Sequence, residues 1–529
     1  MGKAENAGMR EIRGPRRRGK HQRQPMRPPH GAANTFVRPI SFAAPFPLIP
    51  VLRFFRSSLP AQLLVLLGLL LALRLPLLAL LGLPLTAGEL GALLVGERVH
   101  GGALPYRDLY DGTAPLAAYF FAGLDGLTAR PVFLYRAVAL ALLLGQALRL
   151  NFVLNRADAF PDRGYLVALA YLLLGSVSTD LDALSPLLIG HTFIVFALSA
   201  LLPTLREGYD NRRLFRAGFL VGLAGLCYLP LLLFVGVGLL AVVIFAANAF
   251  RSFLLLLCGI LFPYAVAVTC FLYVGALPNF VRFHLVPGWR GFGSGAPDGL
   301  PLAVQLKLLA LPAAVLLLAV VRALGTPLGP VFQAKFRQLM VGWLLVALAV
   351  LAAGRGGAPG ALVLLLPPLA YFGLFLWQRG RPAWAPEVLF LVLLGAVVAL
   401  RYRPLVPGLE TALRLPAESA FAPRPAPALA GLHGQRLLVL GPDRRAYLTN
   451  YSATPYLDWD LALADFNYLD QYAAVVRVGR QVGADPPAYV LDQRHLLPQL
   501  RHLLPGVFGP YEPAGPAGLY RHSAVISGR

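Results

Sequence analysis

A series of long apolar runs separated by short charged connections constrains this chain more than any other feature. The first run, 61–85, has Arg74 as its only charge and exceeds the roughly 20 residues with which a helix crosses a bilayer. A lipid environment requires every backbone polar group to be bonded within the segment, so such runs are expected to be helices. The predicted crossings are 61–85, 132–153, 165–177, 186–202, 217–229, 231–249, 253–274, 302–321, 339–353, 361–377 and 387–400.

Composition supports a membrane protein. Of the 529 residues, 57% are hydrophobic and 14% are charged, whereas soluble domains carry about 25% charged residues. The net charge of +22 at pH 7 comes largely from an Arg-rich tail and from residues that flank the apolar runs. This distribution predicts a positive-inside orientation, with the tail near anionic headgroups, and it argues against nucleic acid as a partner.

The segment 114–128 is shorter than a crossing and contains Asp125. We expect it to lie along the outer membrane interface, with Tyr119, Phe120 and Phe121 as anchors. This choice places the Arg-rich connections in the cytoplasm, as the positive-inside rule requires. The prediction is therefore a mainly α, polytopic bundle of about eleven spans, with the N-terminus inside and the C-terminus outside.

Composition also divides the chain into four parts. Residues 1–60 form a basic cytoplasmic tail that is disordered over 1–39 and ends in a juxtamembrane segment, and 61–400 form the transmembrane domain with an outer loop at 86–131. The Pro-rich stretch 401–430 is typical of a linker. Strand-like runs within 434–443, 486–492 and 517–525, separated by helix-like runs at 461–480 and 495–504, predict a small extracytoplasmic α/β domain over 431–529.

The outer loop 86–131 concentrates acidic residues, of which Glu89, Asp108 and Asp111 are the candidate catalytic carboxylates. Charged groups at a water-facing membrane site are costly unless they are used or paired. Arg107 lies beside Asp108 and can bind an anion such as a phosphate. The alternative is a solvated loop whose acids pair with neighbouring arginines.

Two later outer loops supply candidate substrate-binding residues. Asp180 and Asp182 lie in the segment STDLDALSP, and Arg282 and Arg290 lie in NFVRFHLVPGWRGFG. Carboxylates suit Mg²⁺ or Mn²⁺, although no spacing here demands a metal. The three cysteines show neither a disulfide pattern nor a zinc pattern and are interpreted as apolar packing residues.

The order of an outward first crossing, an acidic loop with GALPYRDLYDG, and an aromatic helix that begins at Pro115 resembles the GT-C superfamily of polytopic glycosyltransferases, especially the protein mannosyltransferase and aminoarabinose transferase kind. The resemblance covers 86–191. It implies that an acid early in the first outer loop acts as a base or positions the acceptor, and that the sugar donor is attached to a polyprenyl phosphate in the outer leaflet. The family commonly has an Asp-Glu pair where this chain has Gly88 and Glu89, so only Glu89 carries over.

The leading hypothesis is a membrane glycosyltransferase that uses a polyprenyl-phosphate-linked sugar to modify a glycan, lipid or protein acceptor at the outer face of a bacterial inner membrane. Glu89 or Asp108 would be the base, and Arg107, Arg282 or Arg290 would hold the phosphate. The alternative is a non-catalytic transporter or envelope assembly component on a similar scaffold. Acids or broken helices at mid-membrane would favour a transporter, and the crossings contain few charges.

Overall fold

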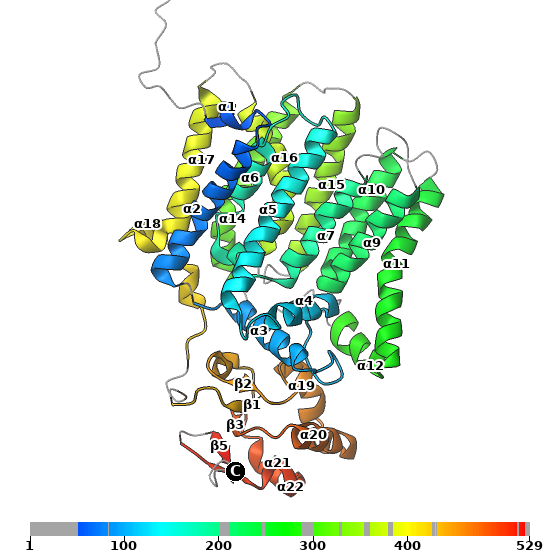
Figure 1. The fold of residues 1–529 in the computed structure, drawn as a ribbon, viewed down its shortest axis with the longest axis vertical. Coiled ribbons are helices and arrows are strands. Elements are labelled where there is room, and N and C mark those ends of the chain that lie inside the picture. Colours follow the sequence, from blue (N-terminus) through cyan, green and yellow to red (C-terminus); the bar gives the residue numbers. More distant parts are fainter. Residues whose placement is uncertain are drawn as a thin grey trace, which may run out of the picture. The chain divides into compact units, whose positions relative to one another are not determined.

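The computed structural model describes residues 51–82, 84–201, 211–245, 249–286, 300–326, 331–353, 360–378, 384–425, 429, 431–515 and 518–523. The chain from Ile49 to Arg529 forms one compact unit, which is shown as a ribbon in Figure 1. The predicted disordered tail lies outside the described residues.

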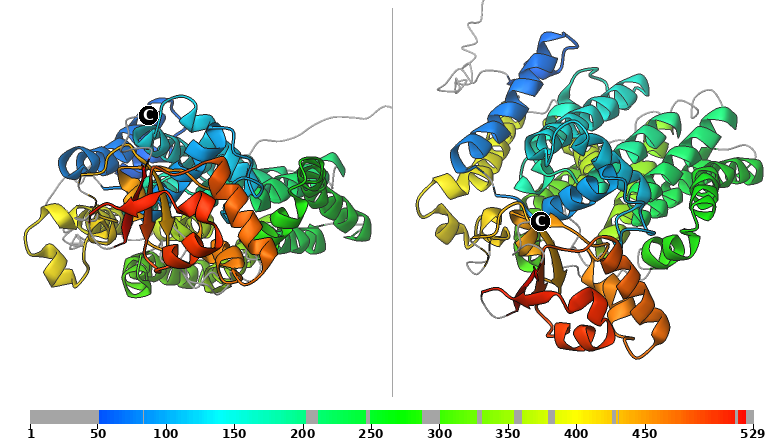
Figure 2. Two further views of the ribbon diagram at one scale, coloured as in Figure 1. Left: turned by 90° about the horizontal axis from the view of Figure 1, so that it is seen from below. Right: turned by 60° about the horizontal axis from the view of Figure 1, so that its bottom comes forward.

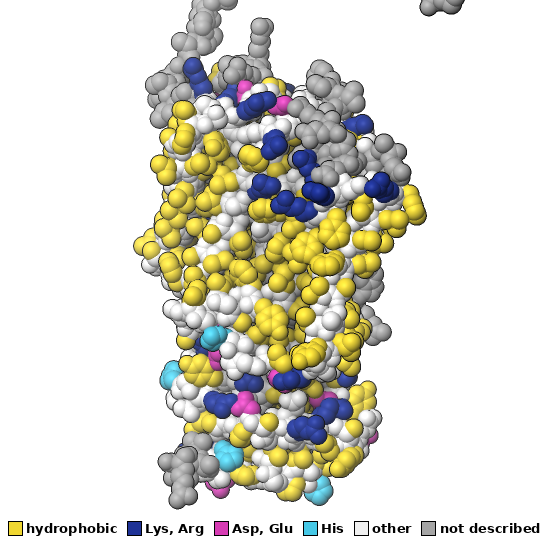
Figure 3. All heavy atoms as spheres, turned by 45° about the vertical axis from the view of Figure 1, so that its right-hand side comes forward, with side chains coloured by type: hydrophobic (Ala, Val, Ile, Leu, Met, Phe, Trp, Pro, Cys, Tyr) yellow, Lys and Arg dark blue, Asp and Glu magenta, His cyan; other side chains and the backbone are white. Residues whose placement is uncertain are grey.

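Within the described residues, six helices are long and apolar enough to cross a membrane, and each coincides with a predicted crossing. They are α2 (Ala61–Leu81), α5 (Val132–Arg156), α11 (Ala249–Tyr273), α14 (Leu302–Leu324), α15 (Val331–Ala353) and α17 (Ala385–Tyr402). Many of their large apolar side chains are exposed, such as Leu317 at 66% and Val392 at 63%. Such an apolar surface fits a lipid environment, and Figure 3 shows it as a broad hydrophobic belt with Lys and Arg side chains gathered above it. The described chain is thus a helical membrane protein.

The other predicted crossings are helical but shorter. They correspond to α6 (Leu166–Leu174), α7 (Pro186–Leu201), α9 (Asn211–Cys227), η2 with α10 (Leu229–Phe234 and Val235–Phe245), and η4 with α16 (Ala361–Leu365 and Leu366–Trp377). All nine residues of α6 are buried, which explains why this helix is apolar on every side. The total of eleven crossings and their orientation remain predictions.

Small residues allow α9 and α11 to approach closely. A Cβ atom at Gly218 would lie 2.1 Å from the backbone oxygen of Leu256, and a Cβ atom at Gly259 would lie 2.3 Å from the backbone oxygen of Phe215. Backbone contact through glycines is a common way to pack membrane helices, because lipid supplies little hydrophobic drive for their association.

Two shorter helices follow α2 at one end of the bundle, namely α3 (Ala87–His100) and α4 (Pro115–Asp125). The segment predicted to be interfacial is therefore a helix of 11 residues. Of its three expected anchors, Tyr119 is 49% exposed, whereas Phe121 is fully buried and stacks on Tyr135 with ring centroids 5.7 Å apart. Phe121 is thus a packing residue, and its assignment as a membrane anchor was wrong.

The C-terminal part contains a five-stranded sheet in the order β2-β1-β3-β5-β4. Its strands are β1 (Arg436–Leu440), β2 (Tyr451–Ser452), β3 (Tyr489–Asp492), β4 (Tyr511–Pro513) and β5 (Leu519–His522). The first three are parallel, with Leu437 opposite both Ser452 and Tyr489, whereas β5 is antiparallel to β3 and β4. Helices α19 (Trp459–Phe466), α20 (Tyr472–Ala484), α21 (Leu497–Leu503) and α22 (Pro505–Phe508) complete it, and Figure 2 shows these orange to red elements from below. The three predicted strands are confirmed, and β2 and β4 were not predicted.

The sheet packs against α3 and the loop that follows it. Leu90 and Leu94 of α3 share a buried cluster with Leu437 and Val439 of β1. The backbone of Tyr110 donates to the carbonyl of Pro455 at 2.7 Å and accepts from the amide of Asp458 at 3.0 Å. The loop between α3 and α4 therefore connects the helical bundle to the C-terminal sheet.

Candidate functional site

Glu89 begins the candidate site at the first turn of α3. The Thr86 side chain accepts from the amide of Glu89 at 3.1 Å, and the Glu89 carboxylate accepts from the amide of Thr86 at 2.9 Å. This reciprocal capping box satisfies amides that a helix start otherwise leaves unpaired. Arg136 of α5 binds the same carboxylate through two nitrogens, at 2.9 and 3.1 Å, and Glu89 is 3% exposed. A two-pronged, charge-assisted pair of this kind is strong and geometrically specific.

The second acidic segment is the 3₁₀ turn η1 (Thr179–Asp182), which connects α6 to α7. Ser178 caps it by accepting a hydrogen bond from the amide of Asp180. A 3₁₀ helix has three residues per turn, so side chains two residues apart point about 120° away from each other. Asp180 and Asp182 consequently face different surroundings.

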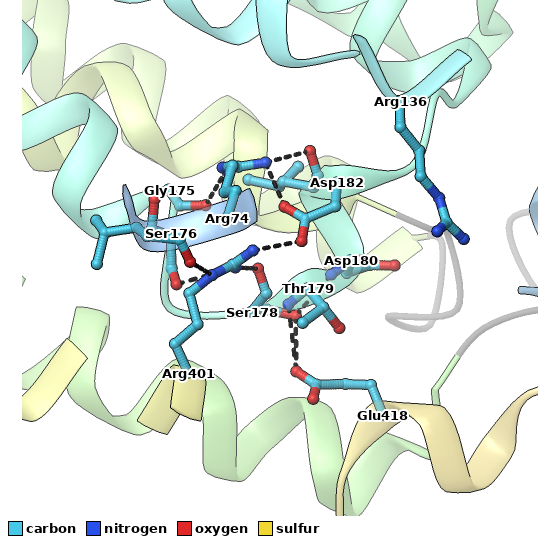
Figure 4. Close-up of polar contacts among 12 residues, drawn as sticks. Arg74, Arg136, Gly175, Ser176, Ser178, Thr179, Asp180, Asp182, Arg401 and Glu418 are labelled. Carbon is cyan, nitrogen blue, oxygen red and sulfur yellow. Dashed lines mark hydrogen bonds and ion pairs between the residues drawn. The ribbon is translucent and has the colours of Figure 1, made fainter. Parts of the chain in front are cut away.

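Asp182 is the shared carboxylate of two buried arginines. It forms ion pairs with Arg74 of α2 and with Arg401 of α17, which are 4% and 1% exposed. Figure 4 shows both guanidinium groups converging on it. One carboxylate therefore joins two membrane helices to the η1 turn.

Other donors of these arginines bind backbone carbonyls. Arg74 donates to the carbonyls of Leu181 at 2.9 Å and Gly175 at 3.0 Å. Arg401 donates to the carbonyls of Leu73 at 2.6 Å, Ser178 at 3.0 Å and Ser176 at 3.3 Å. Buried charges need this degree of hydrogen bonding to offset their loss of hydration, so the cluster fixes the backbone that presents Asp180.

Glu418 approaches the η1 turn from the predicted linker. Its carboxylate accepts from the Ser178 hydroxyl and from the amide of Thr179, both at 3.3 Å, and forms an ion pair with Arg403. The described part of 401–430 contains the short helices η5 (Arg403–Leu405), α18 (Leu409–Leu413) and η6 (Glu418–Phe421). The linker prediction thus missed that this stretch carries a buried ion pair against the site.

Asp180 differs from its neighbours because no arginine among the described residues pairs with it. Its carboxylate accepts a hydrogen bond from the amide of Gly360. Burial raises the pKa of Asp180 to about 6; the Gly360 amide opposes this rise, and the negative charges of Glu418, Asp182 and Glu89 add to it. In Figure 4 the Asp180 carboxylate points away from Arg401, toward the side on which the Arg136 guanidinium lies. The two acidic segments therefore share one electrostatic environment.

The structure separates the other predicted site residues from Glu89 and Asp180. Asp108 forms a largely exposed ion pair with Arg107 at 2.9 Å and accepts from the amide of Leu104. Asp111 is 8% exposed and accepts from the amide of Thr113 at 2.7 Å, so it shapes the loop that contacts the C-terminal sheet.

Of the two arginines predicted in the later outer loop, Arg282 is exposed beside the Phe283 ring at 5.9 Å. Arg290 lies outside the described residues. Of the features that the structure describes at Arg282, only its exposed positive charge would suit phosphate binding.

Sequence reasoning missed the basic residues of the site, which are Arg74, Arg136, Arg401 and Arg403. One signal was available, because Arg74 is the only charge within the first apolar run. A charge in a spanning segment is a functional candidate by default, with a partner to be found. The partner, Asp182, lies 108 positions away, and nothing in the local sequence identifies it.

The described residues contain no group of three or more His, Cys, Asp or Glu side chains placed to hold a metal ion. Glu89 and Asp182 are also committed to arginines. The residues described at this site therefore do not fit a bound Mg²⁺ or Mn²⁺.

An apolar cavity of about 160 Å³ lies near the same turn, between α6, α14, α16 and α17. Leu174 is part of its lining, and the next residue, Gly175, accepts from Arg74. The other lining residues are Ala170, Leu311, Ala314, Val315, Leu318, Gly373, Leu376, Trp377, Leu389, Val392, Leu393 and Ala396. The cavity thus presents hydrocarbon surface, and its Leu174 end adjoins the charged cluster.

No protein-family model matches this chain, and no curated protein matches it in sequence. Among solved structures, it is similar to the Archaeoglobus fulgidus oligosaccharyltransferase complexed with zinc and sulfate, at 13% identity and a TM-score of 0.39 over 83% of this chain and 69% of that chain. It is also similar to the oligosaccharyltransferase AglB from that organism, complexed with an inhibitory peptide and a dolichol-phosphate, at 13% identity and a TM-score of 0.39 over 83% and 70%. At this identity and TM-score, the likeness assigns no function to this chain.

Proposed function

We propose that this protein is a GT-C-type membrane glycosyltransferase that transfers a sugar from a polyprenyl-phosphate donor at the outer face of the membrane. The observation that carries the proposal is that Glu89 and Asp180, which follow different predicted crossings, influence each other electrostatically, while Glu89 is paired with the guanidinium group of Arg136. Carboxylates beside a fixed cation are what an inverting sugar transfer to a hydroxyl or amide acceptor needs.

Asp180 is the best candidate for the general base. A base is most effective when its pKa lies near the working pH, and the pKa of Asp180 is raised to about 6. Its carboxylate is half-buried and has no arginine partner among the described residues, so an acceptor's proton can reach it. This assignment differs from the roles predicted from the sequence, in which Glu89 or Asp108 was the base and Asp180 bound substrate.

Arg136 is the best candidate for the residue that binds the donor phosphate. Its side chain is 11% exposed and already forms a two-pronged pair with Glu89, a geometry that suits a phosphate equally well. Glu89 would then position Arg136 and regain it when the polyprenyl phosphate departs. The apolar cavity beside Leu174 would hold the first isoprene units of the lipid.

Orientation follows from the basic residues at the other end of the bundle. Arg149 and Arg156 lie at the end of α5 opposite to Arg136, and the positive-inside rule places such an end in the cytoplasm. The site and the C-terminal sheet would then face outward. We propose that the sheet, which contacts the loop between α3 and α4, helps to bind the acceptor.

The test is sugar transfer by the purified full-length protein from a panel of labelled polyprenyl-phosphate sugars. Asp180→Asn should abolish transfer, and Arg136→Gln should weaken use of the donor. Asp108→Asn, which alters an exposed ion pair, is the matched control and should be nearly as active as the wild type. Wild-type rates for Asp180→Asn would refute the assignment of the base.

One observation favours the non-catalytic alternative. Glu89 and Asp182 both form ion pairs with arginines, as they would in a purely structural cluster. A scaffold of this kind would bind no donor. Absence of both transfer and donor binding across the whole panel would therefore support that alternative.

A further inference from the structure

A polar pocket lies at the end of the bundle away from the candidate site. It has a volume of about 160 Å³ and is lined by Arg149, Arg156, Ser199, Ala200, Arg213 and Arg216. Its residues come from the ends of α5 and α7 and the beginning of α9. Arg156 lies 20 positions beyond Arg136 on α5, which is about 30 Å along the helix axis.

Helix geometry explains why the four arginines converge. Arg149 and Arg156 are two turns apart on α5, and Arg213 and Arg216 are separated by three positions on α9, so each pair shares one helix face. Arg149 donates to the Ser199 hydroxyl at 2.7 Å, and that hydroxyl donates to the carbonyl of Phe196 at 2.6 Å. The pocket therefore has a hydrogen-bonded polar wall as well as charged side chains.

Arg149 is held in the pocket by its surroundings. Its guanidinium lies over the rings of Phe196 at 5.0 Å and Phe152 at 5.7 Å. Its Nε atom is buried and has no hydrogen-bond partner in the described structure. Because the two rings hold this guanidinium in place, an anion in the pocket would pair with a fixed charge.

The charge of the pocket leads to the same conclusion. The described lining residues include four arginines and no acid, and the charges of Arg156 and Arg216 both act on Arg149. The ordinary explanation is that each arginine separately contacts the cytoplasmic headgroup region, as the positive-inside rule describes. That explanation does not account for a walled pocket that reaches Arg149, two helical turns from the end of α5.

We propose that this pocket binds the phosphate group of an anionic ligand. Arginine forks match phosphate oxygens, and basic pockets between membrane helices on the cytoplasmic side bind anionic headgroups. A phospholipid headgroup and a soluble phosphate present the same chemistry here. The pocket is separate from the candidate glycosyltransferase site, so this proposal stands independently of the proposed function.

The experiment measures binding to the full-length protein in a neutral detergent by microscale thermophoresis. The probes are dioctanoyl phosphatidylglycerol, inorganic phosphate and the zwitterionic dioctanoyl phosphatidylcholine. Arg213→Gln/Arg216→Gln removes two charges from the pocket. The matched control, Arg251→Gln/Arg322→Gln, also removes two exposed charges. Arg251 lies near the start of α11 and Arg322 lies near the end of α14.

The pocket variant should bind an anionic probe at least about tenfold more weakly than the wild type, whereas the control should change little. Selective binding of phosphatidylglycerol identifies a lipid, and comparable binding of inorganic phosphate identifies a soluble phosphate; either result supports the proposal. Equal weakening in both variants, or no binding of either anionic probe, overturns it.

A milder variant keeps the test decisive if the double Gln variant does not fold. Arg213→Lys/Arg216→Lys keeps both charges but removes the guanidinium forks. It should weaken binding of the anionic probe several-fold while leaving the net charge unchanged. Wild-type binding by this folded variant would show that the pocket has no geometric selectivity for phosphate and would overturn the proposal.

Discussion

Asp180 and Asp182 lie in the same 3₁₀ turn, yet their replacement by Asn should have opposite effects on stability. In Asp182→Asn, the buried Arg74 and Arg401 lose their shared carboxylate. Removing one partner of a buried ion pair costs about 3–5 kcal/mol. Backbone carbonyls still accept from both arginines, so we expect the lower end, about 3 kcal/mol.

Asp180→Asn removes a charge that the fold disfavours. The pKa of Asp180 is raised from 3.8 to about 6. This shift sets an upper bound of about 3 kcal/mol on what the ionised carboxylate costs the folded protein at neutral pH. The actual cost is smaller because water screens a half-buried group. Because the pKa of Asp180 is raised on folding, its contribution to stability is highest below pH 3.8 and is lost as the pH rises through about 6. Asn keeps an oxygen to accept from the Gly360 amide, and Asp180→Asn should therefore be as stable as the wild type or more stable.

The assay is thermal unfolding of the purified variants in one detergent, followed by intrinsic tryptophan fluorescence at pH 7.5 and pH 5. Asp182→Asn should unfold at a lower temperature at both pH values. Asp180→Asn should match or exceed the wild type at pH 7.5. Any excess should shrink to roughly half at pH 5, because Asp180 is then largely protonated in the folded protein but still ionised in the unfolded chain. A loss of stability in Asp180→Asn as large as that in Asp182→Asn would refute the reasoning.

The other predictions concern catalysis, packing and topology. If Asp180 is the base, kcat/KM for transfer should fall about tenfold per pH unit below about pH 6; a flat profile down to pH 5 would exclude it. Arg136→Gln leaves the buried Glu89 unpaired and should lower stability by about 3–5 kcal/mol, and Glu89→Gln in the same chain should restore most of the loss in a thermal melt. Gly218→Ala should destabilise by about 1–3 kcal/mol because its Cβ would meet a backbone oxygen, whereas Gly145→Ala, with open space around it, should not, as thermal melts of both variants will show. A cysteine at the 84% exposed Tyr472, in a chain whose native cysteines are replaced by Ser, should react with an impermeant maleimide from the outer side of intact cells, and reaction only after lysis would reverse the predicted orientation.

Much of the fold was predictable because lipid imposes strong rules on backbone hydrogen bonding. Every predicted crossing contains a helix, since an apolar run in a bilayer has few alternatives. The short strands β2 and β4 were missed because two or three paired residues, such as Tyr451 and Ser452, leave no alternating pattern to detect. Phe121 was misassigned because an aromatic residue in an amphipathic segment has the same sequence signature whether it faces lipid or core.

The site was less predictable because its contacts join distant segments. Glu89 was predicted as a site residue from its position after the first crossing, and Asp180 and Asp182 were predicted from their loop. Their partners were not, because Arg136 lies 47 positions from Glu89 and Arg401 lies 219 positions from Asp182. Such pairings depend on how the helices pack, which no local pattern encodes.

The segment TDLD shows how packing divides two similar acids into different roles. Both aspartates follow the same helix and differ in sequence only by their place in a 3₁₀ turn. The direction of Asp182 brings it to the two arginines that enter from α2 and α17, and the resulting ion pairs hold the turn in place. The direction of Asp180 takes it away from those arginines, toward the field of Glu89 and Glu418, where its pKa rises. The ion pairs of Asp182 therefore hold Asp180 in an environment that is unfavourable for its charge but useful for chemistry. Removing Asp182 should impair the reactivity of Asp180 even where the protein still folds.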